Sequence, residues 1–580
     1  MCGIIGVTGT SDALTFLTKG LKALEYRGYD SAGVAFFDDS SIKSVKTVGR
    51  ITALESKLKG LPTASCGIGH TRWATHGCPN EINCHPHSSF GGKFTLVHNG
   101  IIENCDALRA MLVRSGVTPT SDTDSEIVAH LLELHYDGDP LSTLENVTHM
   151  LEGSYALAVI CADFEGEIFA TKRRSPLLIG REGNEVFLAS DVTAMPMGGD
   201  VRLLADGHTA RLSADGFEVF ERGKRVEAEK VSGELTEMTA TLCGYPRFML
   251  KEIFEQPEAI ARTVTPVCGK STPKLGRKGV LLVGCGSSYH AALACKPLIE
   301  SVTGMGAEVT LASEFICSHP TPAEGRTCVL ISQSGETADT IAAADEALKR
   351  GYKRLAITNV ATSTLARVCD EVFHAKAGPE IAVATTKGFT TQIASLAVLA
   401  SERDSELRAE IAELPALAEK ALKASEKVEE LVHLFTNAKC AFFIGRKSDY
   451  GVALEGALKL KEITYIPSIG LAAGELKHGS ISLVESGSPV VVVCANGKLI
   501  AKTLLSVATV KARGGVTIAV TCFEEVAAAC DYAVLLPPLP SLLSPAVTVI
   551  PLQLLAYHVA VALNRDVDKP RNLAKSVTVE

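Results

Sequence analysis

The chain has 580 residues, of which 46% are hydrophobic and 21% charged, and its 57 basic and 66 acidic side chains give a net charge of −9. This length predicts about three or four domains, and the composition is that of a soluble globular protein and excludes a disordered chain. The acidic balance argues against nucleic acid or an anionic membrane as a partner, and apolar runs such as Pro489–Cys494 are too short to span a bilayer, so no membrane segment is expected.

The cysteines and the N-terminus indicate the compartment. The 17 cysteines are odd in number, scattered, and include no Cys-x-x-Cys pair, which is typical of reduced thiols in a cytoplasmic protein. The first nine residues lack the basic segment of a signal peptide, and their apolar stretch ends at Thr8. We therefore expect a first β-strand at the N-terminus and a cytoplasmic location.

Residues 2–222 contain short strand patterns separated by Gly, Asn and Asp turns, such as Ser154–Cys161 and Glu185–Ala189, with helical segments such as Ser125–Tyr136. Many short strands and few helices predict a layered α+β domain with antiparallel sheets. Over residues 223–245 the periodicity weakens and charges cluster, which we interpret as a linker.

After the linker, strand patterns such as Gly279–Gly284 alternate with helical patterns such as Ser288–Thr303. Near-continuous apolar strands that alternate with helices predict parallel, doubly wound α/β sheets. The pattern repeats, since Leu282–Ala292 matches Phe443–Ala453 at an offset of 161 residues and two later segments match at offsets of 162 and 163. This repeat predicts two α/β domains, at 246–405 and 420–565, followed by a C-terminal tail at 566–580.

One loop of the first α/β copy is a candidate phosphate cradle. Ser332, Ser334 and Thr337 lie between a strand and a helix, where hydroxyl groups and backbone N–H groups can bind an anion without a lysine. The alternative is ordinary helix capping by Ser334. The second copy has Cys494, Asn496 and Leu499 in the matching loop, so one anion site is expected rather than two.

Cys2 is a candidate nucleophile. Once Met1 is removed, its α-amine, with an ordinary pKa near 7.7–8.0, lies a few bonds from a thiol with a pKa of about 8.5. This arrangement pairs a nucleophile with a general base. The alternative is a plain buried cysteine.

Several segments downstream of Cys2 carry a resemblance to a known family. They are Leu24–Ser31, His70–Gly77, His85–His87, His98–Asn104 and Ser121–Glu126. They resemble the glutaminase domain of the class II, or N-terminal-nucleophile, amidotransferases. Leu-Glu-Tyr-Arg-Gly-Tyr-Asp-Ser and Thr-Arg-Trp-Ala-Thr-His-Gly are most similar to the glutamine–fructose-6-phosphate aminotransferases, also called glucosamine-6-phosphate synthases. The α/β repeat resembles the sugar isomerase (SIS) domain, so the resemblance covers essentially the whole chain.

The resemblance implies roles in the glutaminase domain. It assigns the oxyanion hole to Asn99 and Gly100, the glutamine carboxylate to Arg72 and the glutamine ammonium group to Asp124. Asp124 is also a candidate N-cap of a helix that begins at Ser125. Two further glutamine-site residues are implied, His85 to order the loop and Trp73 to gate the passage of ammonia. A metal is not expected, because no structural-zinc spacing occurs among His70, His76, Cys78, Cys84, His85 and His87.

The resemblance also implies the sugar site. Its sugar-phosphate positions are Ser288, Ser332, Gln333, Ser334, Thr337, Val383, Ala384, Thr385 and Lys459. Ser287 replaces a threonine and Thr385 a serine of the usual family pattern, and both keep a hydroxyl group. Lys459 and Glu462 share one face of a helix, for which a solvated charge pair is the alternative. The family assigns ring opening to His478, a Schiff base to Lys575 and proton transfer to Glu462.

Together these residues imply transfer of the amide nitrogen of L-glutamine to D-fructose 6-phosphate, with ammonia channelled between domains. The products would be D-glucosamine 6-phosphate and L-glutamate, in the first step of amino-sugar synthesis. Imine formation with a carboxylate base needs no metal or organic cofactor. The family places the histidine of the Glu-Leu-Lys-His loop across a subunit boundary, so a homodimer is expected.

Two alternatives stay open at the level of sequence. A class II amidotransferase with another acceptor, such as phosphoribosyl pyrophosphate, would carry a strand that ends in paired acidic residues, and the sequence has none. A non-enzymatic phosphosugar sensor with SIS domains would need neither Cys2 nor Lys575.

Overall fold

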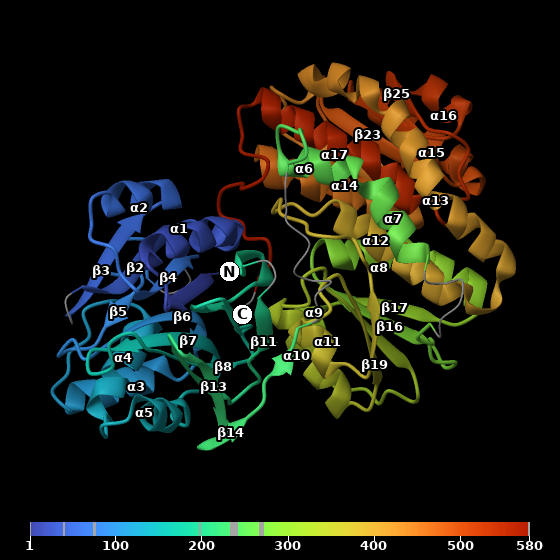
Figure 1. Cartoon of the computed structure of the whole chain (residues 1–580). Coiled ribbons are helices and arrows are strands. Elements are labelled where there is room, and N and C mark those ends of the chain that lie inside the picture. Colours follow the sequence, from blue (N-terminus) through green and yellow to red (C-terminus); the bar gives the residue numbers. More distant parts are fainter. Residues whose placement is uncertain are drawn as a thin grey trace. The chain divides into compact units, whose positions relative to one another are not determined.

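The computed structural model describes residues 2–38, 41–73, 77–196, 199–231, 242–265 and 272–577. The chain divides into two compact units, Met1–Ala240 with Ser576–Glu580, and Thr241–Lys575. The first unit is built on two antiparallel sheets and the second on two parallel sheets (Figure 1). The predicted order, an antiparallel α+β part followed by doubly wound α/β copies, is confirmed.

The first unit is a sandwich of two sheets. One has the strand order β15-β11-β9-β10-β1-β4-β2-β3 and the other β14-β13-β12-β8-β7-β6-β5. Successive side chains of a strand point to opposite faces, so in β1 Ile4 packs between the sheets while Ile5 packs against α1. The strands are β1 (Gly3–Thr8), β2 (Ser31–Asp38), β3 (Ser41–Val48), β4 (Cys66–Arg72), β5 (His87–Ser88), β6 (Phe94–Ile102), β7 (Gly153–Cys161), β8 (Ile168–Arg173), β9 (Leu178–Glu182), β10 (Glu185–Ala189), β11 (Asp200–Leu203), β12 (Thr209–Ser213), β13 (Gly216–Glu221), β14 (Lys224–Val226) and β15 (Glu229–Lys230).

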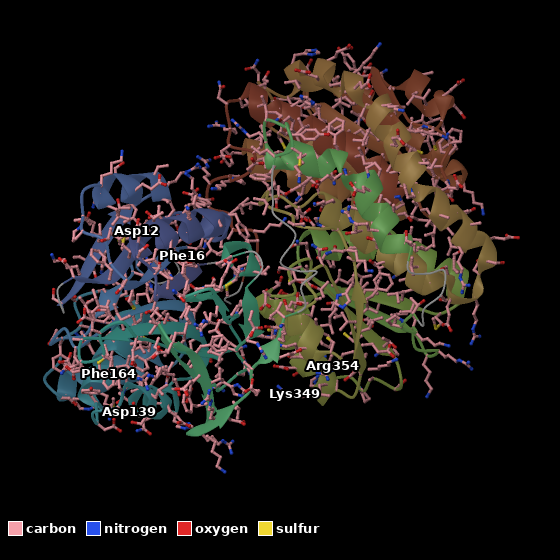
Figure 2. All side chains as sticks on the ribbon, in the orientation of Figure 1. Asp12, Phe16, Asp139, Phe164, Lys349 and Arg354 are labelled. Atoms are coloured by element: carbon pink, nitrogen blue, oxygen red, sulfur yellow. The ribbon has the colours of Figure 1, made fainter. Side chains whose placement is uncertain are left out.

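Helices cover both outer faces of this sandwich (Figure 1). Asp12 and Phe16 are labelled in Figure 2. Asp12 caps the first helix, because its carboxylate accepts the Thr15 N–H at 3.1 Å, and Phe16 stacks on Phe187 of β10. Asp139 caps the last of these helices in the same way through the Leu141 and Ser142 N–H groups. The helices are α1 (Ala13–Leu24), α2 (Ile51–Leu58), α3 (Cys105–Arg114), α4 (Asp124–Leu134) and α5 (Pro140–Thr148).

The predicted linker at 223–245 is wrong for its first part. Lys224–Val226 forms β14 beside β13, and Glu229–Lys230 forms β15 beside β11. The clustered charges that suggested a linker belong to edge strands, which commonly carry charged side chains. Residues 232–241 of the same stretch lie outside the described residues.

The second unit contains two copies of one α/β fold. Their strand orders are β17-β16-β18-β19-β20 and β22-β21-β23-β24-β25, which are equivalent when β16 is aligned with β21. The predicted repeat is therefore confirmed. The first copy comprises β16 (Val280–Gly284), α8 (Ser287–Thr303), β17 (Ala307–Leu311), α9 (Ala312–Cys317), β18 (Thr327–Ile331), α10 (Ala338–Lys349), β19 (Lys353–Thr358), α11 (Thr364–Val368), β20 (Glu371–His374) and α12 (Lys387–Ala400).

The second copy and the flanking helices complete this unit. The second copy comprises β21 (Ala441–Gly445), α14 (Ser448–Thr464), β22 (Ser468–Ala472), β23 (Pro489–Cys494), α15 (Ile500–Lys511), β24 (Val516–Thr521), α16 (Glu524–Ala529), β25 (Tyr532–Leu535) and α17 (Pro545–Ala562). Two helices, α6 (Phe248–Phe254) and α7 (Gln256–Val264), precede the first copy, and α13 (Ser405–Ala424) joins the two copies.

One hydrophobic core serves both copies, with Leu298 of α8, Phe389 of α12, Leu460 of α14 and Leu552 of α17 in a single cluster. Among the described residues, α17 is the one helix long and apolar enough to cross a membrane, and 83% of it is buried inside the fold. The expectation that all apolar runs are short is wrong for α17. Its apolar character all round follows from its central position in the core.

The helices α8 and α14 cross closely because Gly451 lacks a side chain. A Cβ atom on Gly451 would lie 2.6 Å from the Ala294 nitrogen and 2.8 Å from the His290 oxygen, which are backbone atoms that cannot move cheaply. The crossing brings the start of α8, from the first copy, against the middle of α14, from the second.

We predict that Gly451→Val lowers the free energy of unfolding of the second unit by about 1–3 kcal/mol or more, because an added side chain forces the helices apart. Its transition temperature should fall accordingly. Differential scanning calorimetry of the full chain measures this effect. Gly306→Ala is the matched control, because a Cβ atom there meets nothing within 4 Å. Equal transition temperatures for the two variants would contradict the prediction.

Candidate active sites

Cys2 lies at the start of β1, next to the end of β4. Its Sγ accepts the Trp73 N–H at 3.3 Å, and its carbonyl oxygen accepts Asn99 Nδ2 at 3.1 Å and Arg27 Nε at 3.3 Å. Burial raises the pKa of the Cys2 thiol, while the positive charges of the amino terminus, Arg72 and Arg27 oppose that rise. The structure thus brings Cys2 and Asn99 together, as the sequence predicted.

Trp73 contacts the thiol through its backbone, a role that the sequence analysis missed. Its indole ring packs edge-on against Tyr29, with ring centroids 5.7 Å apart. The gating role of this side chain stays a prediction. Arg27 was also missed, although it lies in the Leu-Glu-Tyr-Arg-Gly-Tyr-Asp-Ser motif, and that motif was the available signal.

His70 sets the orientation of the Asn99 amide. Its Nε2 lies 2.9 Å from the His98 carbonyl oxygen and 3.1 Å from Asn99 Oδ1. Both are acceptors, so Nε2 carries the proton, and burial lowers the pKa of His70 to about 3, which keeps the ring neutral. With Oδ1 bound to His70, the Asn99 NH₂ group faces Cys2.

Gly100 and Asp124 occupy constrained positions beside Asn99. Gly100 has φ +132° in β6, and a Cβ atom there would overlap the Ser154 carbonyl oxygen, so only glycine fits. The Asp124 carboxylate accepts the Ile102 N–H at 2.9 Å. The prediction that Asp124 caps the helix is wrong, because Thr123 takes that position and Asp124 is the first residue of α4.

Arg72 and His85 are two further buried residues of the first unit that the sequence predicted for the glutamine site. Arg72 ends β4, is buried, and donates to the Gly77 carbonyl at 3.3 Å. His85 stacks on His70 with ring centroids 4.0 Å apart and accepts the His98 N–H at 3.3 Å. These contacts support the strand that carries Asn99. Among the described residues, no group of three or more His, Cys, Asp or Glu could hold a metal ion, and His76 lies outside them.

The buried histidines predict acid sensitivity of the first unit. Burial lowers the pKa of His70, His85 and His87 below the ordinary value of 6.5. The unfolded chain therefore binds protons that the folded chain excludes as the pH falls below 6.5. The free energy of unfolding should be level above pH 7 and fall below pH 6.5, by about 1.4 kcal/mol per histidine per pH unit.

Fluorescence of the single tryptophan, Trp73, during denaturant unfolding reports on this unit. His87→Gln should make the loss between pH 6.5 and 5 less steep, whereas the exposed His135→Gln should leave it unchanged. The prediction is wrong if the wild-type unfolding free energy is the same at pH 5 and pH 7.

The second site lies where strands of the first copy diverge. β16 lies between β17 and β18, so the connections to its two neighbours run in opposite directions, and doubly wound sheets bind ligands at such a switch point. The loop after β18 holds the predicted phosphate cradle. Ser332 Oγ accepts the Gly335 N–H at 3.0 Å and lies 2.9 Å from Thr337 Oγ1, while Ser334 Oγ accepts the Glu336 N–H at 3.1 Å.

The alternative in which Ser334 caps the helix is not what the structure shows, because Thr337 is the residue before α10. The predicted phosphate cradle packs against the start of α12. A Cβ atom on Gly388 would lie 3.0 Å from Gln333 Cγ, so the two segments are in close contact. Ser288, at the start of α8, accepts Gln392 Nε2 at 3.0 Å. The segment after β20 carries Val383, which donates its N–H to the Asp568 carbonyl at 2.9 Å, and the buried Ala384.

Glu380 binds several groups of that segment and the tail lysine, and it was not among the residues predicted from the sequence. Its Oε1 accepts the Thr386 and Gly388 N–H groups at 2.8 and 2.9 Å, and its Oε2 accepts Thr385 Oγ1 at 2.5 Å and Lys575 Nζ at 2.6 Å. Burial alone would raise the pKa of Glu380, but Lys575 and these hydrogen bonds lower it to about 2. The tail lysine is therefore buried, as the partner of a permanent carboxylate.

Glu252 of α6 lies on the other side of the same segment. Its Oε1 accepts the Ile381 N–H and, at 3.3 Å, the Ala382 N–H, while Lys575 Nζ donates to the Ala382 carbonyl at 2.9 Å. Burial and the nearby Glu380 raise the pKa of Glu252 to about 8. Near neutral pH one carboxyl group is thus charged and the other holds a proton. Nothing in the local sequence around Glu252 or Glu380 singled them out.

The predicted Lys459–Glu462 pair is buried and extended by a third charge. Lys459 Nζ lies 2.7 Å from Glu462 Oε2 and 3.4 Å from Glu455 Oε1, and its side chain is only 1% exposed. The two carboxylates raise the pKa of Lys459, although its burial opposes this. The alternative of a solvated charge pair is therefore wrong.

His478 stands apart from these groups. It follows a short helical turn after β22, its side chain is exposed, and the contacts within the described residues do not join it to Glu462, Lys459 or Lys575. Within one chain, contacts do join the loop after β18, the segment after β20 and the tail lysine.

Comparison with known proteins identifies a family for each part of the chain. A family model described as a glutamine amidotransferase domain matches residues 70–197, and one described as an SIS domain matches residues 276–402 and 434–563. The fold and these matches define an amidotransferase domain joined to two SIS domains.

Relatives in Clostridium tetani and Thermococcus kodakarensis, both named glutamine–fructose-6-phosphate aminotransferase [isomerizing], are 41% and 43% identical over 611 and 604 residues and match over 100% of both chains. The chain belongs to the family of isomerizing glutamine–fructose-6-phosphate aminotransferases.

Solved structures resemble the second part of the chain. The C-terminal domain of glucosamine-fructose-6-phosphate aminotransferase from Francisella tularensis is 36% identical, with a TM-score of 0.54 over 57% of this chain and 100% of that one. A tagatose-6-phosphate ketose/aldose isomerase from Escherichia coli, 20% identical with a TM-score of 0.50 over 58% of this chain and 98% of that one, shares the fold.

Proposed function

We propose that this chain transfers the amide nitrogen of L-glutamine to D-fructose 6-phosphate, giving D-glucosamine 6-phosphate and L-glutamate. The observation that carries the proposal is full-length similarity to enzymes of that name, in a chain that holds both a Cys2–Asn99 site and a buried Lys575 beside a phosphate-type loop. Neither alternative, another acceptor or a sensor without catalysis, accounts for both sites.

In the glutaminase half, the Cys2 thiolate attacks the side-chain carbonyl carbon of glutamine. The tetrahedral oxyanion is stabilised by Asn99 Nδ2 and the Gly100 N–H. When the C–N bond breaks, the α-amine of Cys2 passes to the departing nitrogen the proton that it took from the thiol, so that ammonia leaves and a γ-glutamyl thioester remains. Water then hydrolyses the thioester, which releases glutamate and restores the thiol.

Arg72 and Asp124 bind the α-carboxylate and α-ammonium groups of glutamine in this proposal. Their burial beside Asn99 supports these roles, since a charged ligand there is shielded from water. Trp73 gates the passage of ammonia, which is used at the sugar before it meets bulk water.

In the sugar half, Ser332, Ser334 and Thr337 bind the phosphate. Lys575, which pairs with Glu380 as an ammonium group, first gives up a proton, and the free amine then attacks C2 of the open-chain ketose; water leaves and a Schiff base forms. Ammonia then displaces the lysine, and Glu462 moves a proton from C1 to C2, which converts the ketose imine into an aldose with an amino group at C2. The ion pair with Glu380 supports this role, because it holds the lysine at a defined position inside the site.

The proposal includes a homodimer and a cytoplasmic location. His478 is exposed and lies outside the cluster of sugar-site residues, so a second copy would supply it for ring opening. The cysteines support a reducing compartment, since they are scattered along the chain and include no Cys-x-x-Cys pair.

The function is tested by incubating the chain with amide-¹⁵N-glutamine and fructose 6-phosphate and identifying the products by mass. We predict that Cys2→Ala abolishes glutamate release and ¹⁵N transfer, because the thioester cannot form, while sugar isomerisation continues. The exposed Cys78→Ala is the control and should behave as the wild type. Glutamate release by Cys2→Ala at the wild-type rate would contradict the assignment.

We predict that borohydride reduction with fructose 6-phosphate adds the reduced sugar to the peptide that contains Lys575. Lys575→Arg should keep the charge that pairs with Glu380, and hence the fold, but form no adduct, because a guanidinium group does not condense with a ketone here. Peptide mass spectrometry measures both. An adduct on Lys459, or one that persists in Lys575→Arg, would contradict the prediction.

A further inference from the structure

We propose that His290 is a positioning residue for the proton transfer assigned to Glu462, acting through Glu455 and Lys459. The inference rests on the proposed function. His290 belongs to α8 of the first copy, whereas the other three residues belong to α14 of the second. A side chain of one copy would thus control the catalytic base carried by the other.

The contacts form a continuous chain. His290 Nδ1 lies 2.9 Å from Glu455 Oε2, and Ser287 Oγ donates to Glu455 Oε1 at 2.8 Å. Glu455 is fully buried, yet its pKa is lowered against the effect of burial, by Lys459, His290 and Ser287. Glu455 is therefore an ionised acceptor, and His290 donates to it through a protonated Nδ1.

This arrangement sets the position of the lysine. Lys459 Nζ is 3.4 Å from Glu455 but 2.7 Å from Glu462. Because His290 and Ser287 satisfy both oxygens of Glu455, the lysine is left to pair more closely with Glu462. Without the imidazole, Glu455 Oε2 would be a buried charge that lacks a donor, and it would compete for Lys459.

The internal repeat argues that the network serves function and is not needed to hold the helices together. The offset of 161 residues places Gly451 at the position of His290, and Ala294 at the position of Glu455. Gly451 and Ala294 do meet, in close backbone contact, on the other side of the same helix crossing. The crossing is thus made once by plain packing and once by the hydrogen bond between His290 and Glu455, so packing alone suffices for the fold.

The contacts that the structure describes join His290 to Glu455 and, beyond it on α14, to Lys459 and Glu462. Loss of the imidazole leaves Glu455 to compete for Lys459, which draws the ammonium group away from Glu462 and changes the position of that base. The proposed phosphate ligands Ser332, Ser334 and Thr337 are not part of this network, so the rate of amino-sugar formation should fall while sugar binding changes little.

The test compares His290→Ala with His290→Asn in the full chain, since the asparagine amide can still donate to Glu455. For His290→Ala we expect kcat for amino-sugar formation to fall about tenfold or more, with the KM for fructose 6-phosphate changed less than about twofold. Glutamine hydrolysis without sugar should be unchanged. His290→Asn should recover most of the rate.

Three results decide the matter. A His290→Ala enzyme with the wild-type kcat overturns the inference alone. So does equal loss in His290→Ala and His290→Asn that follows a fall in thermal stability, because the role would then be structural. A wild-type chain that forms no amino sugar overturns the proposed function and this inference with it.

Discussion

Two ammonium groups, those of Lys459 and Lys575, are carried into the interior of the second unit, where their side chains are only 1% and 4% exposed. A buried charge is costly unless partners compensate it, and much of the sugar site consists of such partners. Glu380 holds Lys575, while Glu455 and Glu462 hold Lys459. Glu380 also binds backbone N–H groups and Glu455 binds the Ser287 hydroxyl, so the carboxylates that compensate the lysines also order the segments around them.

In the first unit the cost of burying a charge is avoided, because the buried histidines are neutral. His70, His85 and His87 are buried beside Arg72, and burial keeps their rings uncharged. A neutral imidazole has one donor and one acceptor, so each ring can direct a neighbouring group. His70 uses its donor to orient Asn99, which in turn faces Cys2. The geometry around the nucleophile therefore depends on residues that contact no substrate in the proposed reaction.

The two copies in the second unit have equivalent backbones, but their side chains differ. The first copy carries the candidate phosphate site. The backbone is repeated closely, since Gly286 and Lys447 before the equivalent helices have φ values of 51° and 53°, and Gly304 and Tyr465 after them both have φ 68°. The side chains differ at the positions that carry charge. Ser288 in the first copy corresponds to the buried Asp449 in the second, where burial raises the pKa of that carboxyl to about 7. A pocket that already contains this acid suits a phosphate poorly.

The sequence by itself determined the class of each half and most of the candidate residues. Strand and helix periodicity, the repeat at 161 residues and the motifs around Cys2 and Asn99 are local patterns, and local patterns survive without knowledge of the fold. Only the tertiary structure decided which groups hold those residues in place. Glu380 meets Lys575 across 195 residues and His290 meets Glu455 across 165. It also decided that part of the predicted linker is edge strand and that Thr123, not Asp124, caps α4. The physical reason is that a buried charge selects its partner by distance in space, and residues far apart in the chain acquire a distance only when it folds.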